Sequence, residues 1–173
     1  YYEDALEWMQ KGDFRAAVIQ LRNALQKDET NHSARLLLGR LYLQSGNIPS
    51  AQKELEFVHR HQPSDEVEVY LGRTLLMTRL FEDALSVVQP TSDDPSFAAA
   101  KTTIRAEALL SLRRIDEAEA AVEQLLAEDS GSVPANLLMA RIKASKGLGS
   151  EADQHIDAAL VSDPKQVNAY MLR

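Results

Sequence analysis

The chain has 173 residues, of which 45% are hydrophobic, 26% charged and 6% aromatic, a composition typical of folded proteins and too apolar for an intrinsically disordered one. The formal net charge of −7 and the pI near 5.1 argue against nucleic acid as a main partner, because no basic surface dominates. There is no Cys, which excludes disulfides, thiol catalysis and thiolate zinc sites, and no apolar run approaches the roughly 18 residues of a membrane span.

The first part of the chain predicts two helical hairpins in succession. Tyr1–Asn31 shows the periodicity of two amphipathic helices joined by a tight turn at Gly12. His32–Ser64 repeats this order, with Gly46 at the turn. A hairpin of two helices of about 12 to 15 residues each is therefore the expected building block.

A glycine inside a helix marks the second hairpin. The segment Arg35–Asn47, "RLLLGRLYLQSGN", carries Gly39 in an otherwise apolar helical pattern, and Val69–Arg79, "VYLGRTLLMTR", repeats it with Gly72. Gly costs about 1 kcal/mol of helix propensity relative to Ala. We therefore expect each glycine to lie where two helices approach closely, so that packing compensates for this cost.

Three further units follow with the bounds Asp65–Ala98, Ala99–Ser132 and Val133–Gln166. Their turn positions hold Arg79, Arg113 and Gly147. Pro90 is expected to end the second helix of the third unit early, with a kink or longer loop at Pro90–Pro95. Val167–Arg173 then begins a sixth first helix, so we expect the chain to be part of a longer array.

A fixed period connects these units. One column of small residues has steps of 34, 33, 34 and 34 residues, and it consists of Ala5, Gly39, Gly72, Ala106 and Ala140. A second column has the same steps and consists of Ala17, Ala51, Ala84, Ala118 and Ala152. Both columns contain the same single step of 33 residues among steps of 34, and this agreement indicates a true internal repeat.

The pattern resembles the tetratricopeptide repeat family over the whole chain. The second unit shows the family's spacing best, in Leu38, Gly39, Tyr42, Gly46, Ala51, Leu55 and Pro63. The chain departs from the pattern where Lys143 replaces the large inner Tyr of the fifth unit. The resemblance implies an all-α, right-handed TPR superhelix (an α-solenoid) whose first helices line a concave groove.

The positions that face inward in one unit have equivalents in the other units, one repeat period away. Together these positions predict a groove that binds a protein or peptide. Its polar anchors are expected to be Arg40, Arg73 and Arg141, and its apolar floor is expected to be Leu36, Leu43, Val69 and Leu76. Guanidinium groups beside apolar side chains suit a peptide with apolar residues and a carboxylate. Two alternatives remain open: each Arg pairs with an acidic residue of a neighbouring helix, or the Leu column belongs to the core.

No catalytic or metal-binding pattern stands out. His59 and His61 are two residues apart, which places them on different faces of a helix, and the repeat supplies no third ligand. The chain has no Gly-rich phosphate loop, nucleophile elbow or HExxH motif. We therefore expect no enzymatic activity, no cofactor and no metal site.

A narrower resemblance concerns the first two units. "YYEDALEWMQKGDFRAAVIQLRNALQKD" followed by "ARLLLGRLYLQSGNIPSAQKEL" resembles the TPR-repeat lipoproteins associated with the PEP-CTERM/exosortase protein-sorting and exopolysaccharide system. That resemblance implies a scaffold in the bacterial cell envelope that faces the periplasm and is lipid-anchored upstream of Tyr1. The alternative function is end-to-end assembly, in which chain ends containing Met171 and Leu172 stack on one another.

Overall fold

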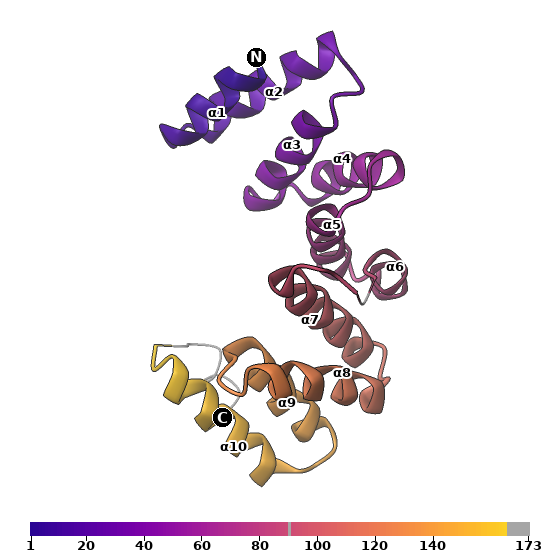
Figure 1. The fold of residues 1–173 in the computed structure, drawn as a ribbon, viewed down its shortest axis with the longest axis vertical. Helices are drawn as coiled ribbons and strands as arrows, with labels where there is room; N and C mark the ends of the chain where they lie inside the picture. The colour runs from indigo at the N-terminus through magenta and orange to yellow at the C-terminus, as the bar shows by residue number, and fades with distance from the viewer. Residues whose placement is uncertain (90, 166–173) are drawn as a thin grey trace. The chain divides into compact units, whose positions relative to one another are not determined.

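The fold is built from α-helices. The structure is a computed structural model that describes residues 1–89 and 91–165, and within these ranges it contains ten helices and no strand. Their bounds (Figure 1) are α1 Tyr2–Gln10, α2 Phe14–Lys27, α3 His32–Gln44, α4 Ile48–His61, α5 Asp65–Met77, α6 Phe81–Val87, α7 Pro95–Ser111, α8 Ile115–Glu128, α9 Val133–Ser145 and α10 Gly149–Ser162. The prediction of an all-α array of helical hairpins is confirmed. The expected sixth first helix at Val167–Arg173 and the ends proposed to stack lie outside the described residues.

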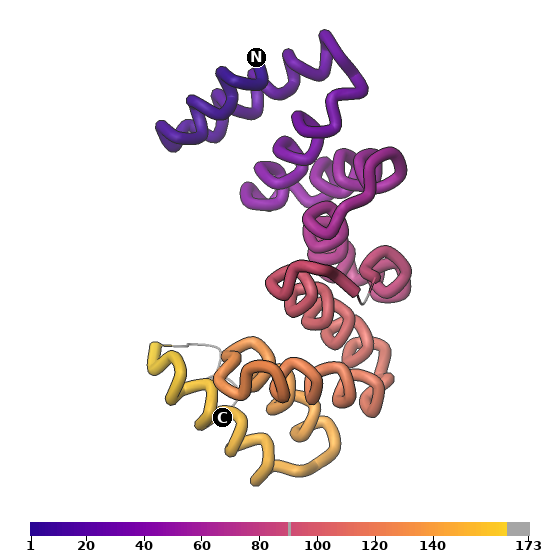
Figure 2. The backbone as a smooth tube through the Cα atoms, viewed as in Figure 1, coloured from indigo at the N-terminus to yellow at the C-terminus, as the bar shows by residue number. Residues whose placement is uncertain are grey.

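The helices form two compact units, divided between Leu80 and Phe81. The first unit holds α1–α5 and the second holds α6–α10. Within each unit, the tube in Figure 2 passes from one helix to the next through short connections, and consecutive helices pack on one another. The prediction of a single array running through both units stays a prediction.

The close approach expected at Gly39 is present in the first unit. A Cβ added at Gly39 would lie 2.8 Å from Cγ of Leu55 on α4, closer than real Cβ atoms come to a neighbour. Leu38 beside it is buried, and so is Leu55. The absent side chain at Gly39 therefore lets α3 and α4 pack directly, which offsets the poor helix propensity of glycine.

All five turn positions identified from the repeat adopt the left-handed backbone conformation. Gly12, Gly46 and Gly147 have φ values of 76°, 76° and 77°, and Arg79 and Arg113 have φ values of 62° and 63°. Glycine adopts this region without steric cost, whereas an L-residue with a side chain does not. The two arginines therefore occupy a backbone position that favours glycine.

The second unit has its own core, formed between α7, α8 and α9 by Ala106, Leu109, Leu110, Ala118, Val122, Leu125, Ala135, Leu138, Met139 and Ile142. Ala140 of α9 and Ile156 of α10 form a smaller cluster. Small residues thus recur where helices meet, as the repeat predicts.

The predicted boundary between Ala98 and Ala99 is wrong as the start of a helix. Helix α7 begins at Pro95, so that boundary falls within its first turns. Asp94 is the N-cap and accepts a hydrogen bond from the backbone N–H of Ser96 at 2.8 Å. Proline is favourable at the first position of a helix because the missing N–H has no partner there in any case. The "DDPS" segment therefore starts a helix, rather than only closing the preceding unit.

Helix α6 is short, as expected from the position of Pro90, although residue 90 itself lies outside the described residues. Arg105 of α7 donates hydrogen bonds from one guanidinium nitrogen to the carbonyl oxygens of Leu85 at 3.0 Å and Val88 at 2.8 Å. One turn earlier on α7, Lys101 is 1% exposed and its Nζ donates to the carbonyl of Thr91 at 3.2 Å. Two cationic side chains thus satisfy carbonyl groups that a longer helix would have paired internally.

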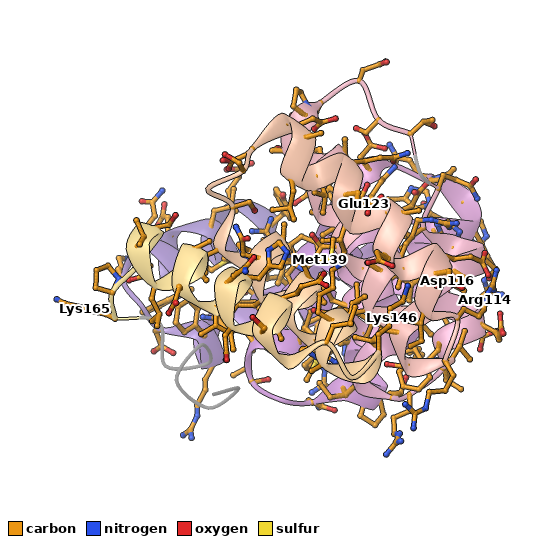
Figure 3. All side chains as sticks on the ribbon, turned by 90° about the horizontal axis from the view of Figure 1, so that it is seen from below. Arg114, Asp116, Glu123, Met139, Lys146 and Lys165 are labelled. Atoms are coloured by element: carbon orange, nitrogen blue, oxygen red, sulfur yellow. The ribbon has the colours of Figure 1, made fainter. Side chains whose placement is uncertain are left out.

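The departure at Lys143 is compensated by an ion-pair cluster that joins α8, α9 and α10. Nζ of Lys143 lies 2.8 Å from Glu119 and 2.9 Å from Glu151. Lys146, which follows α9, pairs with Asp116 at 2.7 Å and also with Glu119, and Figure 3 shows Lys146 beside Asp116. Where the family pattern has a large aromatic side chain, this chain therefore has a cation shared by two carboxylates.

Candidate functional site

The predicted groove residues of the first unit share one face of α3 and one of α5. Leu36, Arg40 and Leu43 follow the i, i+4, i+7 spacing on α3, and Val69, Arg73 and Leu76 follow it on α5. This spacing places each set on one side of its helix, and α3 contacts α5. We call Leu36, Arg40, Leu43, Arg73 and Leu76 the α3–α5 face.

Arg40 is paired across the two helices. Its guanidinium donates to a carboxylate oxygen of Glu66 at 2.9 Å, and its Cζ lies 5.0 Å from the centre of the Tyr70 ring. The pairing with a neighbouring helix, one of the two alternatives left open by the sequence, is therefore present. The Arg40 side chain remains 40% exposed, so guanidinium donors that do not face Glu66 are still accessible to solvent.

Arg73 differs from Arg40 in its surroundings. Its side chain is exposed, and within the described residues it forms no ion pair or hydrogen bond. A guanidinium group in this state offers its full planar set of donors to a carboxylate. Arg141, on α9 of the second unit, is likewise exposed and has no side-chain partner in the described part of the chain.

The assignment of Val69 to the floor of the groove is wrong, because Val69 is 5% exposed and belongs to the core. Helix α5 buries residues around much of its circumference, including Val67, Leu71 and Leu75. A helix that is covered on several sides has no single apolar stripe, so its sequence pattern does not identify the face that remains open. Leu36, Leu43 and Leu76 are half-buried and still present apolar surface.

Sequence reasoning did not identify Glu66 or Tyr70 as partners of Arg40. Both are on α5, 26 and 30 positions along the chain from Arg40 (66 − 40 and 70 − 40). Neither number equals the repeat period, so comparing equivalent positions of successive units does not pair them. The approach of α3 to α5 in three dimensions brings these side chains together.

His61 and His155 each contact neighbouring groups of the fold. His61 stacks on Phe57 with ring centres 4.3 Å apart, and its Nδ1 lies 2.7 Å from the Phe57 carbonyl oxygen. Nδ1 of His155 lies 2.9 Å from the side-chain oxygen of the buried Asn136, and burial lowers the pKa of His155, with the nearby Lys143 acting in the same direction. Among residues 1–89 and 91–165, no group of three His, Asp or Glu side chains is arranged to hold a metal ion.

In the described ranges, no helix combines the length and the apolar character needed to cross a bilayer.

The sequence matches a protein family model and, over a shorter segment, one curated protein. A family model for the tetratricopeptide repeat matches residues 9–70 and 109–173. Cellulose synthase operon protein C of Pseudomonas fluorescens (strain SBW25) is 36% identical over 73 residues, which are 42% of this chain and 6% of that protein. The chain thus spans a small fraction of the length of this curated relative.

Solved structures of similar proteins agree with the fold. The crystal structure of MamA matches with a TM-score of 0.81 and 24% identity, covering 96% of this chain and 98% of that one. YrrB, described as a TPR protein with an unusual peptide-binding site, matches with a TM-score of 0.81 and 19% identity, covering 99% of this chain and 89% of that one. At these identities the likeness shows the fold alone.

Proposed function

This chain belongs to the tetratricopeptide repeat family, and we propose that it is a non-catalytic scaffold that binds a protein or peptide segment on its α3–α5 face. Proteins of this family typically bind protein or peptide partners and are typically not catalytic. The observation that supports the location is the exposed, unpaired guanidinium of Arg73 beside half-buried leucines. Such a surface suits an apolar segment that carries a carboxylate.

The test is a charge reversal at Arg73. Arg73→Glu should reduce capture of the native partner from an extract of the source cells by at least about tenfold. The guanidinium group that would bind a carboxylate of the partner through two hydrogen bonds is replaced by a carboxylate that repels it. Combining it with Arg40→Glu should abolish capture. Captured protein is quantified by mass spectrometry, and far-UV circular dichroism with thermal melting establishes that the variants fold.

Arg60→Glu is the matched control, since Arg60 is an exposed arginine on α4, outside the α3–α5 face. Equal capture by the wild type and Arg73→Glu would contradict the proposed face. Because Arg40 is ion-paired with Glu66, the double variant could lose helicity while Arg73→Glu stays folded. That result would assign Arg40 a structural role, and capture by Arg73→Glu would then decide whether the α3–α5 face binds the partner.

We propose further that the full-length protein works in the bacterial cell envelope, in a protein-sorting or exopolysaccharide system, with a lipid anchor upstream of Tyr1. The narrower sequence resemblance motivates this setting, and the short similarity to a cellulose synthase operon protein is compatible with the exopolysaccharide part. Membrane fractionation of cells that express the full-length protein, with metabolic labelling by a radioactive fatty acid, tests it. A labelled protein in the membrane fraction supports the proposal, and an unlabelled protein in the cytosol contradicts it.

A further inference from the structure

A separate hollow lies between α2 and α3 in the first unit. Its volume is about 330 Å³, at the lower end of the roughly 300–1,000 Å³ of typical ligand pockets. Its apolar lining comes from Phe14, Val18 and Ile19 on α2 and from Leu41 and Tyr42 on α3. Such a hollow can accommodate one bulky apolar side chain of a partner. The hollow shares no lining residue with the α3–α5 face.

Two of the side chains that line the hollow are unusually exposed for their type. Ile19 is 57% exposed and Phe14 is 44% exposed, although both are large and apolar. Ile19 stands between Arg15 and Arg22, at the i, i+4, i+7 spacing of a single helix face. Helix α2 thus presents an apolar side chain with a cation on each side along its length.

The charge on these two helices is opposite to that of the chain as a whole. Helices α2 and α3 carry five Lys and Arg residues and no Asp or Glu, whereas the chain has a net charge of −7. Arg35 and Arg40 of α3 are paired with Glu54 and Glu66.

The cations of α2 have no such partners. Arg15, Arg22 and Lys27 are exposed and form no ion pair within the described residues. Arg15 also borders the hollow.

We propose that the hollow between α2 and α3 is a second docking site, and that it binds an acidic peptide segment of another protein. A bulky apolar side chain of the segment enters the hollow, and carboxylates about one helical turn to either side pair with Arg15 and Arg22. Charge complementarity selects this occupant, because unpaired guanidinium groups favour carboxylates. An anionic bilayer fits less well for two reasons. A hollow accommodates a single side chain better than it accommodates a flat membrane surface, and the net negative charge of the chain opposes its approach to an anionic bilayer.

Selection from a phage-displayed library of random peptides tests the proposal. The expected peptides carry Leu, Phe or Trp flanked by Asp or Glu. A fluorescein-labelled copy of the most enriched peptide is then titrated with the protein by fluorescence anisotropy. Binding should weaken at least about tenfold with Ile19→Ser and with Arg15→Glu, and it should also weaken as the NaCl concentration rises.

Matched variants establish whether binding depends on the hollow itself. Val161→Ser removes an apolar side chain that is 83% exposed on α10, and Arg60→Glu reverses an exposed charge on α4; both should leave binding unchanged. Arg73→Glu should also leave it unchanged, so failure of this site is distinguishable from failure of the α3–α5 face. Circular dichroism shows whether each variant is folded.

Four results would overturn the proposal. The first is a selection that enriches no peptide with acidic and apolar residues, and the second is peptide binding that neither Ile19→Ser nor Arg15→Glu weakens. The third is concentration-dependent self-association of the protein that Ile19→Ser removes. The fourth is binding of the protein to vesicles of phosphatidylglycerol and to no peptide. The third result would identify a second copy of the chain as the occupant, and the fourth would identify a membrane.

Discussion

At the scale of single residues, the five hairpin turns all use the left-handed backbone conformation, and the residue in this conformation is either glycine or arginine. Gly12, Gly46 and Gly147 meet the left-handed conformation without strain, whereas Arg79 and Arg113 adopt it with a side chain attached. A Cβ added at Gly46 would have no neighbour within 4 Å. The cost of a side chain at Gly46 is therefore a backbone cost rather than a packing cost.

We predict that Gly46→Ala lowers the free energy of unfolding by about 1 kcal/mol, because an L-residue is strained in this region by roughly 1–2 kcal/mol. Conversely, Arg113→Gly should raise the free energy of unfolding by less than about 1 kcal/mol, because the relief of strain slightly exceeds the effect of the added entropy of the unfolded chain. Urea denaturation of both variants measures the two effects. A stabilising Gly46→Ala would contradict this account of the turn.

At the scale of elements, α8, α9 and α10 are connected by the cluster around Lys143 and Lys146. Hydrogen bonds from Lys143 and Lys146 hold the pKa of Glu119 below its ordinary value. Hydrogen bonds to Glu119 and Glu151 raise the pKa of Lys143 above its ordinary value. Each shift means that the folded state favours the charged form of that group.

The stability contributed by this cluster should consequently depend on pH at both extremes. The Glu119 contribution is present above the pKa of the unfolded chain and is lost as pH falls through the lower folded pKa, so the loss begins below roughly pH 4 to 5. The Lys143 contribution is complete below its unfolded pKa and is lost as pH rises beyond roughly pH 10. We predict that Glu119→Gln lowers the melting temperature at neutral pH and that its difference from the wild type shrinks in acid.

Melting curves recorded by circular dichroism across the pH range measure this difference. Glu123→Gln is the control, because Glu123 is exposed on the same helix and has no ion pair in the described part of the chain (Figure 3). A Glu119→Gln effect that is constant with pH, or one that Glu123→Gln reproduces, would show that the cluster does not stabilise through its charges.

At the scale of the whole molecule, most of the helix contacts within each unit link helices that are neighbours in sequence. Within the first unit α3 packs with α4 and α4 with α5, and within the second α7 packs with α8 and α8 with α9. Stability in such a chain is approximately a sum of local and nearest-neighbour contributions. A local defect should therefore act mainly on its own unit.

We predict that Gly39→Val accelerates amide hydrogen exchange in α3 and α4 much more than in α9 and α10, because the added side chain forces Leu55 away from the α3 backbone. Hydrogen exchange measured by mass spectrometry resolves the helices. Leu38→Val, a change at the buried neighbour of Gly39 that shortens the side chain without forcing the helices apart, is the comparison. Equal acceleration in both units would mean that the chain unfolds as one cooperative body.

The repeat and much of the fold were predictable from the sequence, because they depend on local spacing. The positions of Gly39 and of the five turn residues repeat at a nearly constant interval, because close helix packing requires a small residue at the first position and the left-handed turn favours glycine at the others. The start of α7 was misplaced because Pro95 serves both as a helix terminator and as a favourable first residue of the next helix. Periodicity alone does not distinguish these two roles.

The candidate site was predictable only in part. The sequence by itself determined the family, the helical hairpins and the exposed positions of Arg73 and Arg141. Only the tertiary structure decided that Val69 is buried, that Arg40 pairs with Glu66, and that α2 and α3 enclose an apolar hollow beside Arg15. The reason is physical: a repeat pattern fixes which side of a helix faces its neighbour, whereas ion pairs and hollows depend on side chains from different helices meeting in space.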